Sequence, residues 1–290
     1  MKKITTLFFC IILIFVLILS SDTKEITTNA IVPFFIMVLP TLAPALLLNN
    51  LISYSGGFLS LLNSKEKNNK VYNINIAFLI ISGLISGTPA LASSIDYEIN
   101  KSISKEDGEL ILECFSFPSL PFIIALINIS PWPKIKLLLT IFIPYLLAII
   151  YFLLKYPKIN HLKEFNFNQN NEKNIFSKAI LKTFKSIILM TGSILFFSLF
   201  LIILIKLIPF SYIFYIQGIL EFSYPLTYLF NNYSVLNQVI STFIFAFSSI
   251  SLLMQIQLLV KDISIAKITK KRLELAVIST LIIILFTFIF

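Results

Sequence analysis

The stretch ISGLISGTPALASSIDYEINKSISKEDGEL, Ile81–Leu110, decides how this chain folds, because an apolar run ends there and an acidic segment begins. The 15 residues Val71–Ile85, ahead of its Gly-x-Pro sequence, would form a helix of about 22 Å. The hydrocarbon core of a membrane is about 30 Å thick. We therefore expect a helix to end inside the membrane at Ser86-Gly87-Thr88-Pro89, which leaves hydroxyls and backbone groups free there.

The composition of the whole chain is that of a membrane protein. Of its 290 residues, 57% are hydrophobic and 13% are charged, and the mean hydropathy is +0.91. Soluble domains have about 25% charged residues. We expect an all-α polytopic membrane protein in a lipid bilayer, with about 7–8 transmembrane helices plus re-entrant or broken segments. The apolar runs lie near residues 4–20, 31–53, 72–93, 110–129, 135–154, 186–208, 235–260 and 273–290.

The charge distribution and the rare residues exclude several classes of function. The net charge of +9 comes from lysines in the loops between apolar runs, which indicates membrane topology and not a nucleic-acid partner. Cys10 and Cys114 lie in apolar runs and the single histidine, His161, lies in a polar loop, so no metal site is indicated. No P-loop, GxSxG or HExxH sequence occurs. We expect no enzymatic activity, no cofactor and no metal.

Loop charges predict the topology of the first half, residues 30–154. The basic start Met1–Lys3 places the N-terminus in the cytoplasm, and residues 1–29 are interpreted as a retained anchor with a short outer loop, the alternative being a cleaved signal peptide. Residues 94–109 have a net charge of −3 and are expected outside, whereas the basic linker 155–185, with seven lysines, is expected in the cytoplasm. Both placements are possible only if one of the two apolar runs between these segments, 110–129 or 135–154, does not cross the membrane.

The run that fails to cross is expected to be 110–129, because the prolines of its CFSFPSLPF sequence, Pro118 and Pro121, break a helix in its middle. The alternative is an ordinary proline-kinked span. In the second half, residues 186–290, the piece 218–230 is too short to cross easily and 261–272 is basic enough to lie inside. Each half then contains one re-entrant segment.

An internal similarity supports two inverted halves. The segments ISKEDGEL, Ile103–Leu110, and ITKKRLEL, Ile268–Leu275, are identical at four of eight positions, and each is interpreted as opening a helix with Ser104 or Thr269 as its cap. The first is acidic and expected outside, the second basic and expected inside. Opposite charge at opposite sides is typical of the inverted-topology repeats of transporters.

Polar residues inside apolar runs are the candidate solute-binding residues. A cavity is expected to collect them from both halves, although hydroxyls can also bond to their own helix, Glu221 can lie at the outer interface and the glutamine can serve helix packing. Asn49 and Asn50 are interpreted as interfacial. The predicted site residues are Ser86, Gly87, Thr88, Pro89, Ser119, Pro121, Asn128, Glu221, Ser251 and Gln255.

These motifs, in this order, resemble the sporulation integral membrane proteins of the YlbJ type, which carry nucleoside-recognition (Gate) domains. The resemblance rests on VLPTLAPALLLNNLI (Val38–Ile52), on the SGTP stretch leading into an acidic helix, on CFSFPSLPFII, on Gly218–Glu221 and on Ser251–Gln255. The chain departs from the family pattern at several polar positions, now Thr88, Leu91, Ser116, Phe117, Ser249 and Leu253.

The resemblance implies a multi-pass protein of the cytoplasmic or forespore membrane that passes or recognises a small solute such as a nucleoside. The alternative is a non-transporting scaffold, or an accessory permease subunit, needed for the spore coat or cortex. Its partners would then be further copies of itself or other membrane proteins of spore assembly.

Overall fold

The computed structural model describes residues 34–55, 68–99, 103–156, 174–207, 210–260 and 263–289, and a few isolated positions before residue 34. Within them every regular element is a helix. The expected N-terminal anchor, residues 1–29, lies almost entirely outside the described residues, and so does much of the basic linker expected at 155–185.

The described helices fall into two series along the chain, before and after the linker that follows residue 156. The first series is the π-helix η1 (Phe34–Val38), α3 (Leu39–Tyr54), α4 (Asn68–Ser86), α5 (Thr88–Ile99), α6 (Lys105–Phe115), α7 (Leu120–Ile129) and α8 (Lys134–Lys155). The second is α9 (Ile175–Leu207), α10 (Phe210–Leu220), α11 (Ser223–Asn231), α12 (Val235–Phe247), α13 (Ile250–Leu259) and α14 (Ile265–Ile289).

The described part of the chain has the helices and the surface of a membrane protein. Large apolar side chains on the outer faces of α8, α9 and α14 are exposed, among them Leu153, Ile188 and Leu285. Exposed apolar side chains in such number need a cover, which a bilayer supplies. Within the described residues, four segments are long and apolar enough to cross a membrane: Lys105–Ile129, Lys134–Lys155, Ile175–Phe200 and Val235–Leu259. The expected all-α membrane protein is confirmed at this level.

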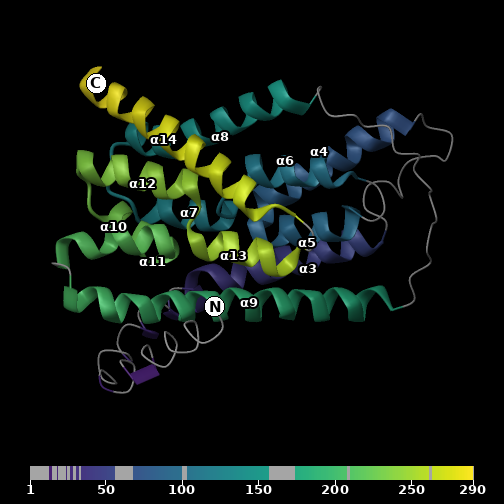
Figure 1. Ribbon diagram of the computed structural model, residues 1–290, viewed down its shortest axis with the longest axis horizontal. Helices are drawn as coiled ribbons and strands as arrows, with labels where there is room; N and C mark the ends of the chain where they lie inside the picture. Colours follow the sequence, from purple (N-terminus) through teal and green to yellow (C-terminus); the bar gives the residue numbers. More distant parts are fainter. Residues whose placement is uncertain are drawn as a thin grey trace.

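Helices α4 and α5 form a hairpin whose tip is Gly87. Gly87 has φ +77°, a left-handed backbone that favours glycine and that reverses the chain between the two helices. At the open end of the hairpin the Asn75 amide donates to Oε2 of Glu98 (3.1 Å). Both ends of the hairpin therefore lie at one end of the bundle, on the right in Figure 1.

Helices α10 and α11 form a second hairpin, with its tip at Glu221 and Phe222. The rings of Phe214 in α10 and Tyr228 in α11 stack at 3.8 Å, so the two helices run side by side. Near the open end Trp132, between α7 and α8, stacks on Phe230 at 4.9 Å. This hairpin opens at the other end of the bundle, on the left in Figure 1.

The segment expected to be re-entrant, residues 110–129, instead runs the length of the bundle. Helix α6 begins beside the start of α14, where Lys267 contacts Glu109 (3.1 Å), and α7 ends beside α11 at the opposite end. The segment that turns back is 72–99, because Gly87 reverses the chain where a straight helix would continue. A break made by Ser119 and its flanking prolines changes the helix direction without reversing it.

The expectation that Ile103–Leu110 and Ile268–Leu275 lie at opposite ends is also wrong. The backbone N–H of Ser264 and the Lys267 amine both bond to the Glu109 carboxylate (2.9 and 3.1 Å). One acid of the first segment, Glu109, is therefore paired with Lys267, the residue directly before the second segment, so the two segments begin at the same end of the bundle. Ser104 does cap α6 by accepting from the Asp107 N–H (3.1 Å), whereas Thr269 lies inside α14 and bonds back to Ile265.

Packing is reciprocal between the two series. Helix α6 contacts α8 and α14, and α12 contacts α14 and α8. Helix α5 contacts α13, α7 contacts α11, α8 contacts α14, and α3 contacts α9. The breaks of the α6–α7 and α12–α13 pairs meet at the centre, where Phe117 and Phe245 stack with their centroids 5.8 Å apart.

Candidate functional site

A cavity of about 50 Å³ lies where both hairpin tips meet the break between α6 and α7. It collects residues that are far apart in the sequence, and seven of the ten predicted site residues line it. These are Ser86, Gly87, Thr88, Pro89, Ser119, Glu221 and Gln255. The three that do not line it are Pro121 in the first turn of α7, Asn128, which is exposed near the end of α7, and Ser251.

The tip of the α4–α5 hairpin is fastened to the break between α6 and α7. The Thr88 hydroxyl donates to the carbonyl oxygen of Phe117 (3.0 Å), which the break has freed from helical bonding. A Cβ on Gly87 would lie 3.0 Å from the backbone N and the Cβ of Ser119, so only glycine allows this approach. Ser86 donates to the carbonyl of Ala45 in α3 (3.4 Å). Neither hydroxyl bonds to its own helix.

The tip of the α10–α11 hairpin presents the acidic group of the cavity. Glu221 is 4% exposed, and its carboxylate accepts from the Ser223 N–H (3.0 and 3.1 Å) and from the Ser223 hydroxyl (2.7 Å). Because these donors belong to the first turn of α11, the carboxylate caps that helix at its positive end. Among the lining residues, Glu221 is the one with an ionisable side chain, and it lies inside the protein rather than at an outer interface.

Gln255 joins the cavity to the interface between α13 and α9. Its amide nitrogen donates to the hydroxyls of Ser193 in α9 (2.7 Å) and Ser251 (3.4 Å). The helix-packing interpretation therefore fits Ser251, whereas Gln255 both packs and lines the cavity.

The chemistry of the cavity is that of a neutral or cationic ligand site. Three helices begin at or beside lining residues, at Thr88, Leu120 and Ser223, and the single carboxylate of the lining, Glu221, bonds to the first turn of the third. The remaining wall consists of aromatic and aliphatic side chains, including Phe34, Phe117, Phe122, Phe222, Met190 and Ile194. A cavity of about 50 Å³ holds a few water molecules or a small cation. A nucleoside-sized solute enters only if the hairpin tips separate.

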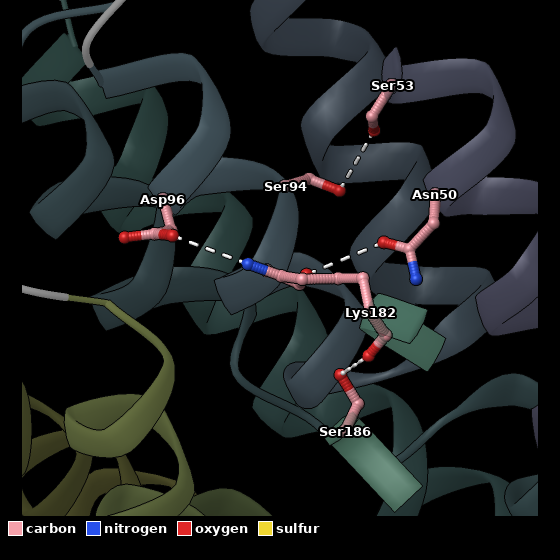
Figure 2. A network of polar contacts seen from close by, with 7 residues as sticks. Asn50, Ser53, Ser94, Asp96, Lys182 and Ser186 are labelled. Carbon is pink, nitrogen blue, oxygen red and sulfur yellow. Dashed lines mark hydrogen bonds and ion pairs between the residues drawn. The ribbon is translucent and has the colours of Figure 1, made fainter. Parts of the chain in front are cut away.

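A polar seam beside the cavity was not anticipated. We use this name for Asn49, Asn50 and Ser53 of α3, Ser93, Ser94 and Asp96 of α5, and Lys182 and Thr183 of α9. Figure 2 shows Ser94 of α5 joined to Ser53 of α3, and Asp96 of α5 joined to Lys182 of α9.

The seam holds α5 between its two neighbours. Asn49 donates to Ser94 (2.8 Å), Asn50 donates to Thr183 (3.0 Å), and the Lys182 amine contacts Asp96 (3.4 Å). Asn49 and Asn50 are 5% and 3% exposed, so they are buried and not interfacial. Their neighbours on α5 and α9 are distant in sequence, which is why a pattern within one span could not reveal them.

Arg272 is the second feature that sequence reasoning missed. It was counted among the basic residues of a cytoplasmic loop, yet its side chain is fully buried beside both helix breaks. One signal was available: it is the single arginine in a chain that otherwise uses lysine.

Comparison with known proteins gives no relative: no family model, no curated protein and no solved structure matches this chain.

Proposed function

We propose that this chain is a transporter-like, multi-pass protein of the cell membrane that binds a small solute in the cavity between the two hairpin tips. The observation that carries the proposal is the meeting of Gly87 and Glu221, from hairpins that open at opposite ends, around one partly polar cavity. Discontinuous helices that meet near the middle of a membrane are the usual construction of solute sites in secondary transporters.

An inverted repeat is part of the proposal, with a pairing that differs from the sequence similarity. The α6–α7 pair corresponds to α12–α13, and the caps Ser104 and Ser234 each accept from the N–H three residues later (3.1 and 3.0 Å). The same pairing aligns buried residues of α8 and α14, with Leu137, Ile141, Ala148 and Phe152 matching Ile268, Arg272, Ser279 and Ile283. Residues 30–154 and 186–290 then form the two halves.

The proposed orientation places the open end of the α4–α5 hairpin in the cytoplasm, together with the N-terminus. Lys182, Lys267 and Lys271 lie at this end, and so does Lys155 in the last turn of α8, next to Tyr156, which bonds to Asn73 of α4; this agrees with the positive-inside rule. Single cysteines at Lys105 and Ala266, in a cysteine-free background, are expected to be labelled from the same side by a membrane-impermeant maleimide. A cysteine at Asn232 is expected to be labelled from the other side, and labelling of all three from one side would contradict the orientation.

The solute is proposed to be a small neutral molecule such as a nucleoside, and the setting to be sporulation, because the motifs resemble the YlbJ type. The test is uptake of radiolabelled uridine and adenosine by proteoliposomes. Glu221→Gln is expected to lower uptake at least about tenfold, because a hydrogen-bonding carboxylate in a water-poor site contributes more than about 1.4 kcal/mol. Glu274→Gln, at an exposed ion pair with Lys271, is the matched control and keeps wild-type uptake.

A non-transporting scaffold is the second candidate, and the small volume of the cavity favours it. In that case neither nucleoside is taken up by the wild-type protein, and cells carrying Glu221→Gln form normal spores. Wild-type uptake that Glu221→Gln abolishes would rule out the scaffold as the whole function.

A further inference from the structure

Arg272 is a buried cation without a carboxylate. Its side chain is 0% exposed, and none of the ion pairs among the described residues includes it. A charge in the interior of a membrane protein is costly unless it is paired or serves a function. The compensation for this guanidinium must therefore come from uncharged groups.

The guanidinium is bonded at both helix breaks. Nη2 donates to the hydroxyl of Ser248 between α12 and α13 (2.6 Å), and Nη1 donates to the carbonyl of Cys114 in the last turn of α6 (3.3 Å). The Ser248 hydroxyl in turn donates to the carbonyl of Ser116 (2.6 Å). One cation thus bonds, directly or through one hydroxyl, to oxygens of both broken helices.

Two backbone carbonyls at helix ends belong to this group: that of Cys114 in the last turn of α6, and that of Phe245 in the last turn of α12, which accepts from the Ser248 hydroxyl (3.2 Å). Helix α6 ends at Phe115 and α12 ends at Phe247, and the last carbonyls of a helix lack intrahelical partners and carry the negative end of its dipole. Transporters built from discontinuous helices use such carbonyls and helix ends to coordinate a coupling cation. Here an arginine from α14 occupies that position.

We propose that Arg272 is a tethered cation that fills a cation-binding position between the two breaks, and that its removal leaves a site for a free monovalent cation. The ring of Phe117 lies 4.1 Å from the guanidinium carbon and also lines the cavity, so one aromatic side chain separates the cation from the proposed solute. If the proposed function holds, solute binding in this chain needs no coupling cation at this position. The cation site itself does not depend on that function.

The proposal predicts that a small cation restores a protein from which the charge has been removed. Arg272→Ala and Arg272→Gln are compared with wild type and with Lys271→Ala, which removes the neighbouring, half-buried cation that is paired with Glu274. The readout is the apparent melting temperature in detergent during titration with ethylguanidinium or sodium chloride, with choline chloride holding the ionic strength constant.

We expect both Arg272 variants to melt about 5–10 °C below wild type in choline. Ethylguanidinium or sodium in the millimolar range is expected to restore them with a saturable dependence, whereas wild type and Lys271→Ala do not respond. Arg272→Gln removes the charge but keeps the apolar stem and a hydrogen-bonding amide, so it provides the test even if Arg272→Ala does not fold. A glutamine variant that melts like wild type, or that neither cation restores, would overturn the proposal.

This readout involves no solute. Failure of the cation titration therefore leaves the uptake experiment standing, and failure of uptake leaves the cation site standing.

Discussion

The two helix breaks at the centre of the molecule, between α6 and α7 and between α12 and α13, each interrupt a pair of helices, but different residues produce them. Between α6 and α7, residues 116–119, the backbone stays in ordinary conformations and Pro118 and Pro121 remove the N–H groups that a broken helix would leave unpaired. Between α12 and α13, Ser248 and Ser249 both have positive φ, +69° and +66°. The prolines of the first break are enough to end the helix there. The second break has a strained backbone conformation, which contacts with other helices must stabilise.

The surroundings of the second break are specific. Ser248 is bonded to Arg272 and to Ser116, and Ser249 accepts weakly from the Leu252 N–H (3.5 Å). Strain of this kind costs about 1–3 kcal/mol per residue and persists only where contacts over-determine it. A break encoded by proline should therefore tolerate the loss of any single hydrogen bond better than a break encoded by serine.

The largest expected effect concerns the hairpin tip that rests on the first break. Gly87→Ala forces a side chain onto a positive φ and within 3.0 Å of the Ser119 backbone, so we expect a loss of about 2–4 kcal/mol in the free energy of unfolding. The control is Gly192→Ala in α9, where an added Cβ meets nothing within 4 Å and alanine stabilises a helix by about 0.5–1 kcal/mol. Melting curves in detergent compare them, and equal melting temperatures would mean that the tip does not rest on the break.

A smaller loss is expected at the second break. Ser248→Ala leaves a guanidinium N–H and the Ser116 carbonyl without a partner, which costs about 1.5–3 kcal/mol. Ser279→Ala in α14 removes a buried hydroxyl that bonds only within its own helix, to Leu275, and should change stability by less than about 0.5 kcal/mol. If the two alanine variants have the same melting temperature, the hydrogen bonds of Ser248 do not stabilise the second break.

The smallest effect has the opposite sign. Ser249→Gly removes the strain of a side chain at φ +66° and is expected to raise stability by about 1 kcal/mol. The same change at the first break, Ser119→Gly, gives no such gain because φ there is −66°. Thermal melts of the two glycine variants test this difference between the breaks. A rise in melting temperature for Ser119→Gly alone would mean that the first break is the strained one.

Sequence reasoning succeeded where the signal is local. Apolar runs predicted helices, four of which in the described part are long enough to span a membrane, and Gly-x-Pro predicted the helix end at Gly87. Seven of the ten predicted site residues line one cavity, and their role in binding stays a prediction. Each of these features depends on the backbone preferences or the polarity of a few consecutive residues.

It failed where distant residues decide. The net negative charge of Ile103–Leu110 predicted that this segment lies at the opposite end of the bundle from Ile268–Leu275. Glu109 contacts Lys267, so both segments lie at the same end. The second break has neither proline nor glycine, and only Arg272 and Ser116, far away in the chain, account for it. Asn50 looked interfacial because its partner, Thr183, belongs to another span.

The contact between Trp132 and Phe230 has a practical consequence. Trp132 is the single tryptophan of the chain, it is 4% exposed, and it stacks on the last turn of α11. Its intrinsic fluorescence therefore reports, without any introduced label, whether the open end of the α10–α11 hairpin stays packed against the connection between α7 and α8. Motion of that hairpin can be followed in the native chain through the emission maximum and the quenching of the fluorescence of a single indole.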